Sequence, residues 1–302
     1  MSDQPTSEEL TDTAGRAWRW MLDQVRTDEV GPWIPEQVTG SAADETLPPY
    51  RDSMHSGIAG LAHVLAEIRL DRDWTDEESA LAEAIGTRLR TRGAAELGYN
   101  FFGGLVSDIG AFVALGQQGA AAAVERLAAL AEPDGWPQDQ AVPPRVLPDA
   151  RLSDATLGVA SVAGSSPGEW WRRCLEAVRR SGIPARSHPG FWDNDGRCCG
   201  TAGVGSVLLD SYQRYGDPAD LDFALTLATA VLEHAEGSAN HAWWRFVEHR
   251  AADPVLPPGV GWMQGAAGIA AFLFQAARVV RAGPEAAAVL RMESWWAREG
   301  AA

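Results

Sequence analysis

Two cysteines, Cys198 and Cys199, stand side by side immediately before a glycine pair, Gly200 and Gly203, that opens an apolar run. A cysteine thiolate is both a strong nucleophile and a soft metal ligand, so this pair is the first place to expect chemistry. Adjacent cysteines make a strained and uncommon disulfide, and the chain has three cysteines, an odd number. We therefore expect reduced thiols here.

Two carboxylates precede the cysteines in the sequence, and a cluster of charged residues lies further along the chain. Asp193 and Asp195, in Trp-Asp-Asn-Asp-Gly, are candidates for positioning a substrate amide or accepting a proton, although Asn-Asp-Gly is also a common turn. His249 and Arg250 follow Glu248 and are candidates for general acid-base chemistry or for clamping a peptide. A surface salt-bridge cluster is the alternative interpretation of this second group.

Four further side chains adjoin glycine motifs. Gln264 precedes the last glycine pair and is a candidate to point its amide into a cavity. Most of the 13 tryptophans are expected to pack between helices, but Trp192 and Trp262 are candidates to line an apolar peptide groove. His55 holds a comparable place in the first copy of the motif and is interpreted as a cap or a packed residue.

The glycine pair belongs to a unit that recurs along the chain. The first glycine position of each copy falls at residues 57, 104, 155, 200 and 265, with intervals of 47, 51, 45 and 65 residues. Serine takes the second position in the copy at 104, and alanine takes the first in the copy at 155. Such a period suits a pair of helices with their connections, and the glycines suit close helix packing or a tight turn.

Helical spacing of apolar residues places the elements around these copies. It predicts a first helix from Glu8 to about Arg26, and further helices over 75–92, 168–181 and 219–235, with Thr75 and Asp217 as capping residues. Stretches 131–149 and 251–261 are rich in proline and glycine and read as loops, and the long last interval indicates an insertion between 236 and 260. We expect an all-α fold: an acidic disordered tail over 1–8, then one domain over 9–302.

Composition and charge narrow the classes of partner. The hydrophobic fraction of 46% is ordinary for a globular protein, and the chain shows neither a spanning apolar run nor a basic-then-apolar leader, so we expect a cytoplasmic protein without a transmembrane segment. A formal net charge of −16 disfavours nucleic acid and anionic membranes. A cationic peptide is the partner that this charge attracts.

The sequence resembles the LanC-like family, the lanthionine synthetase C cyclases and their relatives. The likeness covers about residues 50–280 and rests on the glycine copies, on Phe191-Trp-Asp-Asn-Asp-Gly-Arg-Cys-Cys-Gly200 with its continuation, and on Gly261-Trp-Met-Gln-Gly-Ala-Ala-Gly268. It implies an α/α toroid of about six to seven helical hairpins whose inner helices begin at the glycine motifs. It also implies a central cavity with zinc held by cysteine and histidine, where a peptide thiol adds to a dehydroamino acid.

The chain departs from this family at the positions that matter for zinc. Cys198-Cys199-Gly200 stands where zinc-binding cyclases have Cys-His-Gly, and Asp154 stands where the family has a candidate acid-base histidine. Zinc needs three protein ligands, so Cys198 and Cys199 would need a third from His249, His188 or Asp193. The alternative is that one cysteine is buried while the other faces the cavity.

Two functions follow from the resemblance, and fold analogy adds a weaker third. The first is a stand-alone cyclase that forms a thioether ring in a ribosomal precursor peptide, with kinase-like and lyase-like partners to dehydrate it; its catalytic candidates are Asp154, Asp193 and His249. The second is a degenerate pseudo-cyclase that binds the precursor peptide or scaffolds those partners. The third is a glycosidase-like toroid in which Asp193 and Asp195 are acid and base.

Overall fold

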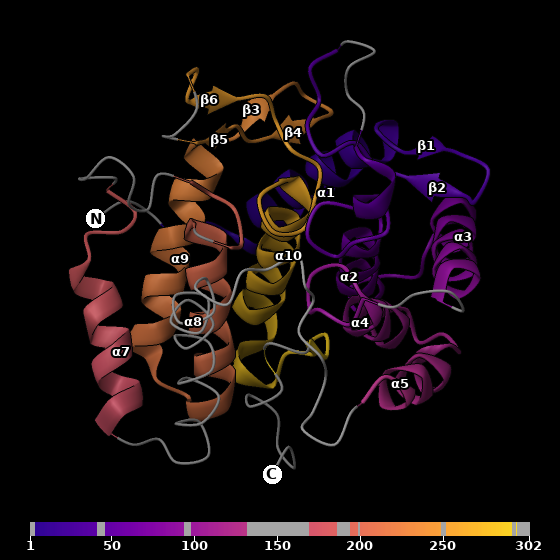
Figure 1. Cartoon of the computed structure of the whole chain (residues 1–302). Helices are drawn as coiled ribbons and strands as arrows, with labels where there is room; N and C mark the ends of the chain where they lie inside the picture. The colour runs from indigo at the N-terminus through magenta and orange to yellow at the C-terminus, as the bar shows by residue number, and fades with distance from the viewer. Residues whose placement is uncertain are drawn as a thin grey trace.

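The computed structural model describes residues 4–40, 46–93, 98–131, 169–185, 194–198, 200–248, 252–291 and 294 (Figure 1). Over these residues the fold is mostly helical, as expected. The α-helices are α1 (Ser7–Asp23), α2 (Ala59–Arg69), α3 (Asp76–Gly93), α4 (Leu105–Leu115), α5 (Ala120–Ala129), α7 (Glu169–Arg180), α8 (Thr201–Tyr215), α9 (Pro218–Glu233) and α10 (Ala266–Ala282). Two short 3-10 helices, Pro48–Tyr50 and Gly283–Glu285, complete the helical elements of this part of the chain.

Three short antiparallel hairpins correct the all-α expectation. They pair β1 (Arg26–Thr27) with β2 (Pro32–Trp33), β3 (Glu236–Gly237) with β4 (Ala242–Trp243), and β5 (Phe246–Val247) with β6 (Val255–Leu256). Each strand has two residues, which is too short to produce the alternation of polar and apolar residues that identifies a strand in a sequence. The segment 236–260, expected as an insertion, contains two of these hairpins.

Capping residues set the starts of the predicted helices. Thr6 and Glu9 form a reciprocal capping box, so Ser7 and Glu8, expected in the disordered tail, form the first turn of α1 instead. Thr75 and Glu78 exchange the same pair of bonds at the start of α3. The Asp217 carboxylate accepts a hydrogen bond from the Ala219 N–H at the start of α9. The helices expected over 75–92, 168–181 and 219–235 are thus confirmed to within two residues at each end.

The four helices that begin at glycine motifs form one row. They pack in the order α8, α10, α2, α4, with α10 near the centre of the view in Figure 1. A second set packs on this row: α9 on α8, α1 on α10, α3 on both α2 and α4, and α5 on α4. Because α1 lies along α10, the first helix of the chain covers the last glycine-motif helix. The copy at 155 lies outside the described residues.

Helices α2 and α10 are buried on all sides along most of their length. Residues 59–68 of α2 and 266–279 of α10 are all buried. By length and composition alone, Ala266–Glu285 also resembles a membrane-spanning segment, and 78% of its most apolar window is buried inside the fold. Packing against α1, α8 and α2 is therefore sufficient to explain its apolar sequence.

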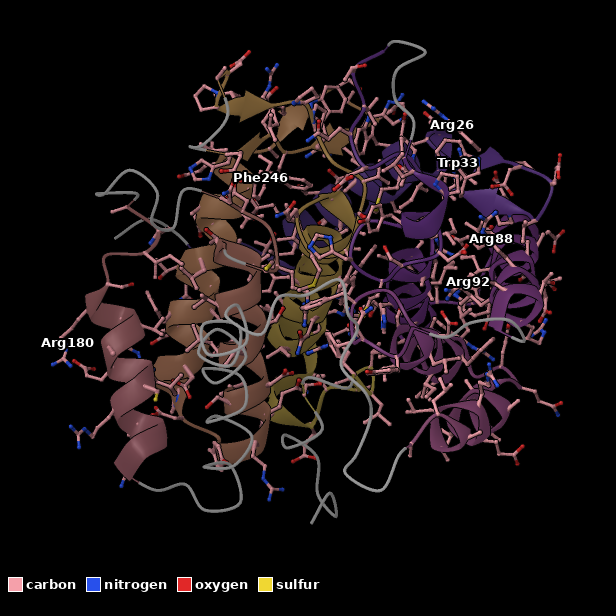
Figure 2. The ribbon with its side chains drawn as sticks, in the orientation of Figure 1. Arg26, Trp33, Arg88, Arg92, Arg180 and Phe246 are labelled. Atoms are coloured by element: carbon pink, nitrogen blue, oxygen red, sulfur yellow. The ribbon has the colours of Figure 1, made fainter. Side chains whose placement is uncertain are left out.

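A helix-hairpin unit occurs twice in the fold. Helix α1 continues into the β1-β2 hairpin, and α9 continues into the β3-β4 hairpin. Trp33 in the first hairpin and Trp243 in the second occupy the same position, each opposite the first residue of the preceding strand. Asp28 in the first turn and Ser238 in the second each accept two backbone N–H bonds. Trp33 lies beneath the guanidinium of Arg26, 5.3 Å from the ring centre (Figure 2).

Candidate functional site

Each described glycine motif closes a small loop against the first turn of its helix. The backbone N–H after the first glycine donates to the carbonyl seven residues earlier: Ile58 to Arg51 (2.8 Å), Leu105 to Gly98 (2.9 Å), Thr201 to Asn194 (3.0 Å) and Ala266 to Gly259 (2.9 Å). This bond gives a partner to one of the N–H groups that a helix start leaves without one. We call these four segments the glycine loops: 51–57, 98–104, 194–200 and 259–265.

The glycines are required because the loop backbone lies directly on the helix start. A Cβ at Gly104 or Gly265 would lie 2.5 Å from the carbonyl oxygen six residues earlier. A Cβ at Gly268 would overlap the Trp262 carbonyl in the same way. Of the two explanations expected from the sequence, close helix packing and a tight turn, the turn applies at these positions.

A ladder of backbone hydrogen bonds joins the four glycine loops. It connects the residue two positions before the first glycine in each loop: the Cys198 N–H donates to the Met263 carbonyl (2.8 Å), the Met263 N–H to His55 (3.0 Å), and the His55 N–H to Phe102 (3.1 Å). The order of the loops equals the order of helices α8, α10, α2 and α4. The loops therefore lie side by side at the N-terminal ends of the four helices. Residues at equivalent positions in these loops come from segments that are far apart in the sequence.

An open cavity of about 620 Å³ lies over the loops that precede α2 and α4. Its lining comprises Glu36, Pro48, Tyr50, Asp52, Ser53, His55, Ser56, Arg92, Gly98, Asn100, Phe102 and Gly103. A much smaller hollow beside it, bordered by Gln264 and Phe246, shares Glu36, His55 and Ser56 with it. The two hollows therefore meet at His55.

His55 is a half-buried imidazole whose burial lowers its pKa below the usual 6.5, an effect that the nearby Glu36 carboxylate partly offsets. Its ring and the ring of Phe102 make a T-shaped contact, with centres 5.7 Å apart. Because the backbone N–H and C=O of His55 are both used in the ladder, the residue is held at a fixed place. At neutral pH its ring is mainly uncharged and able to accept a proton.

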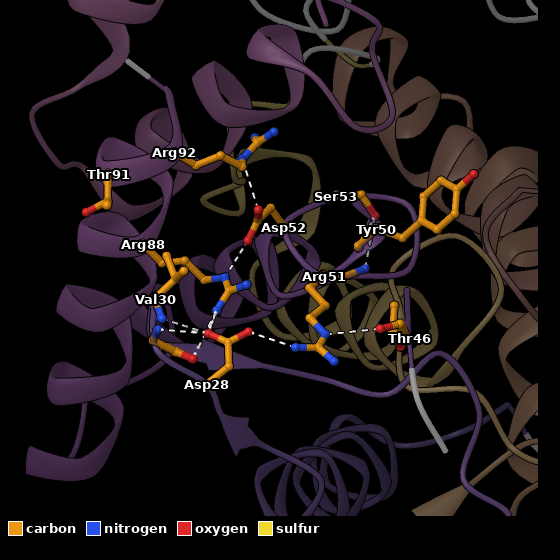
Figure 3. Close-up of polar contacts among 12 residues, drawn as sticks. Asp28, Val30, Thr46, Tyr50, Arg51, Asp52, Ser53, Arg88, Thr91 and Arg92 are labelled. Carbon is orange, nitrogen blue, oxygen red and sulfur yellow. Dashed lines mark hydrogen bonds and ion pairs between the residues drawn. The ribbon is translucent and has the colours of Figure 1, made fainter. Parts of the chain in front are cut away.

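Asp52 and Arg92, which line the cavity, belong to a chain of paired charges (Figure 3). Asp52 forms ion pairs with Arg88 and Arg92, and Arg92 also binds Asp108 through two hydrogen bonds of 2.6 and 2.7 Å. Arg88 continues the chain to Asp28, whose pKa it holds well below the usual range through a hydrogen bond. These pairs join the β1-β2 turn, α3, the glycine loop 51–57 and α4, so the charged groups on this side of the cavity are satisfied by one another and held in place.

Two of the predicted residues lie in the loop before α8. Cys198 is exposed at its ladder position. Asp195 is buried, with 4% of its side chain exposed, and its carboxylate lies 3.0 Å from Nδ1 of His234, whose side chain is 34% exposed. Asp195 therefore holds the end of α9 to the glycine loop, and its contact with a substrate stays a prediction.

The other two described candidates, Gln264 and Trp262, differ in whether they border a hollow. Gln264 is half-buried and borders the smaller hollow beside His55, a position that suits the predicted amide. Trp262 is only 1% exposed, and its ring packs between His63 and the Arg197 guanidinium, with centre distances of 4.8 and 4.6 Å. The expectation that Trp262 lines an apolar groove is therefore wrong, because α2 and the glycine loop before α8 enclose its ring.

Six predicted site residues lie outside the described residues: Asp154, Trp192, Asp193, Cys199, His249 and Arg250. His188, a possible third zinc ligand, lies outside them too. Within the described part of the chain, no three His, Cys, Asp or Glu side chains lie close enough together to hold a metal ion. The described residues thus do not by themselves make up the three-ligand set that catalytic zinc requires.

Sequence reasoning missed His234, and it gave His55 and Glu36 no role in the site. His55 carried a usable signal, because it stands two residues before Gly57 just as Cys198 stands two before Gly200. Glu36 and His234 carried none: each follows a hairpin or helix end, and only folding brings it to a glycine loop.

No protein-family model matches this chain, and no curated protein matches it.

Proposed function

We propose that this chain is a stand-alone LanC-like cyclase of ribosomal peptide biosynthesis. It adds the thiol of a peptide cysteine to a dehydroalanine or dehydrobutyrine in the same dehydrated precursor and so closes a thioether ring. The observation that carries this proposal is the ladder of glycine loops. The ladder brings the exposed Cys198 and the cavity over His55 together at the N-terminal ends of the four helices. The resemblance assigns the chemistry to this same side of the fold.

The proposal includes the finer fold. We propose that the row α8, α10, α2, α4 and its covering helices are an arc of an α/α toroid. Two features support it: the glycine-motif helices are neighbours in a fixed order, and α1, the first helix of the chain, covers α10, the last glycine-motif helix in the sequence. Both are what a ring of helical hairpins requires, since its two chain ends must meet.

Zinc would supply a thiol of lowered pKa at such a site. Cys198 is the described residue suited to hold it, together with ligands from Cys199, Asp193, His188 or His249. Because the described residues do not provide three ligands, we derive no step through the metal. What these residues themselves provide is an exposed thiol, a rigid floor of bonded loops and an open cavity with an uncharged imidazole.

The partners of the proposal follow from its chemistry. The precursor peptide must arrive already dehydrated, so kinase-like and lyase-like proteins are proposed to act before this one. The net charge of −16 favours a cationic peptide.

A direct test uses a synthetic peptide with one dehydroalanine and one cysteine. Addition is an isomerisation, so we expect loss of the iodoacetamide-reactive thiol with no change in peptide mass. Cys198→Ala is expected to lower the rate about tenfold or more. The matched control is Cys174→Ala in helix α7, which is expected to keep the wild-type rate.

The pseudo-cyclase is the second candidate, and the departures at Asp154 and Cys199 favour it. It is distinguished by two measurements on the purified protein: elemental analysis for zinc, and fluorescence anisotropy of a labelled dehydrated peptide. Tight peptide binding without thiol loss and without stoichiometric zinc would replace the cyclase by the pseudo-cyclase. Thiol loss above the protein-free rate excludes the pseudo-cyclase.

A further inference from the structure

His55 lies where the two hollows of the glycine-loop end meet. Both hollows are bordered by Glu36, His55 and Ser56, and the larger one measures about 620 Å³. Volumes of roughly 300–1,000 Å³ are typical of small-ligand sites, so this cavity has room for a short peptide segment. The exposed rings of Tyr50 and Phe102 provide apolar walls for such a segment.

The imidazole is well placed to exchange a proton inside this cavity. Its backbone is fixed by the ladder bonds to Phe102 and Met263, and its ring is fixed against Phe102. The titratable and charged groups that border the same cavity are Glu36, Asp52 and Arg92. Asp52 and Arg92 neutralise one another in an ion pair, so Glu36 contributes the main net charge near the ring.

We propose that the cavity over His55 binds the cysteine-containing segment of the dehydrated peptide and that His55 is the catalytic base for its thiol. This inference rests on the proposed cyclase function. The ring nitrogen of His55 takes the S–H proton, and the thiolate forms a C–S bond to the β-carbon of the dehydroamino acid. The π electrons move onto the α-carbon as an enolate, which takes the proton back from the imidazolium. Nothing is oxidised or reduced, and no group leaves.

The arrangement explains how a thiol is activated on the described side chains alone. Burial keeps the imidazole uncharged at neutral pH, which a proton acceptor requires. Glu36 then stabilises the imidazolium while the proton resides on the ring.

The test measures thiol loss from the dehydroalanine-cysteine peptide as a function of pH. The wild-type rate is expected to rise through a pH below 6.5 and then level off, because only the neutral ring accepts the proton. His55→Gln is expected to lose this limb and about 10²-fold in rate or more. His55→Ala should recover part of the rate when imidazole is added to the buffer, since the cavity then has room for it.

The matched control is His241→Gln, which changes a half-exposed histidine in the β3-β4 turn that pairs with Asp23. It should keep both the rate and the pH profile. Thermal unfolding of each variant checks that it is folded. A second measurement follows the His55 ring by NMR: its pKa should fall further in Glu36→Gln, because the carboxylate raises it.

The outcomes distinguish a failure of the role proposed for His55 from a failure of the proposed cyclase function. If the wild type consumes the thiol and His55→Gln keeps its rate and pH profile, His55 is not the base, although the cyclase stands. If His55→Ala is slow and imidazole does not rescue it, the role of His55 is structural, which also overturns the inference. A wild type without thiol loss overturns both proposals.

Discussion

One backbone position carries four different side chains in this protein. The ladder position is Cys198 in the loop before α8, Met263 before α10, His55 before α2 and Phe102 before α4. All four loops share the seven-residue closing bond and are linked by the ladder bonds, so the chemistry at each place depends mainly on the side chain. Reactive groups at this position are therefore set on a rigid support, which is what precise proton transfer requires.

Glu78 shows how strongly a single residue is tied into the fold. Burial opposes its charged form, but hydrogen bonds from Arg72, the Thr75 N–H and the Trp18 indole outweigh burial and lower its pKa from 4.5 to about 2. The side chain is 3% exposed, and its bonds connect α1, the 71–75 turn and the start of α3.

Glu78→Gln is expected to reduce the free energy of unfolding by roughly 2 kcal/mol at pH 7, since charge-assisted bonds are lost. A carboxyl whose pKa is lowered on folding stabilises the fold above its unfolded pKa and loses that effect as pH falls. The gap between wild type and variant should therefore shrink from about pH 4.5 toward pH 2. Urea unfolding across this range measures it.

The control for this comparison is Glu77→Gln in the same turn, because Glu77 is exposed. Its effect should stay within about 0.5 kcal/mol at every pH. A gap for Glu78→Gln that does not change with pH would show that its ion pair with Arg72 is not the cause.

At the scale of elements, the glycine loop is the repeated unit that organises the fold. Its seven-residue closure gives each helix start a hydrogen-bond partner and brings the loop backbone over the first turn. Neighbouring loops also approach closely, since a Cβ at Gly261 would lie 2.6 Å from the Cα of Ser56. The glycines thus allow contact both within a loop and between loops.

Gly268→Ala is expected to destabilise the protein by roughly 3 kcal/mol, because the new methyl group would overlap the Trp262 carbonyl and lie 2.9 Å from the Arg197 Cβ. Thermal unfolding followed by circular dichroism measures the change. Gly93→Ala at the end of α3 is the control: a Cβ there meets no described atom within 4 Å, so stability should stay equal or rise slightly. Equal stability of the two variants would contradict the overlap.

At the scale of the whole molecule, the segment that follows α10 is anchored among three helices. Arg291 is 1% exposed and binds Glu67 of α2 at 3.3 Å and Asp210 of α8 at 2.8 Å. Arg278 of α10 also pairs with Glu67. This buried network lies in the C-terminal halves of the helices, away from the glycine loops. Backbone hydrogen bonds therefore join the helices at their N-terminal ends, and buried ion pairs join them toward their C-terminal ends.

Arg291→Leu is expected to cost about 3–5 kcal/mol, because it leaves Asp210 without its buried ion pair and Glu67 with one partner fewer. Urea unfolding measures the loss. Arg281→Leu is the control: that side chain is 44% exposed, and its ion pair with Asp71 should contribute about 1 kcal/mol or less. Equal effects of the two substitutions would show that the segment after α10 does not stabilise the helix row.

Much of the helical fold was predictable because its signals are local. Thr75 and Asp217 identified two helix starts, and the glycine pairs identified α2, α4, α8 and α10. The hairpins after α1 and α9 were not predictable, because two-residue strands show no periodicity. The similarity of the two hairpins becomes visible only in the structure, where Trp33 and Trp243 occupy the same position in their strand pairs.

The candidate site was predictable only in part. Cys198 and Gln264 were found from their positions in the repeat, and both lie at the glycine-loop end. Trp262 was misplaced, since an aromatic residue beside a motif has the same pattern whether its ring faces a groove or the core. Glu36 and His234 reach their positions through contacts that join distant segments.

The sequence by itself determined the glycine loops, because a Cβ at those positions would meet the chain's own backbone a few residues away. Tertiary structure alone decided that the ladder runs from Cys198 through Met263 and His55 to Phe102, and that Glu36 lies beside His55. The physical reason is range. Steric and capping effects act over a few residues, whereas burial, ion pairing and the hydrogen bonds between loops depend on which helices become neighbours.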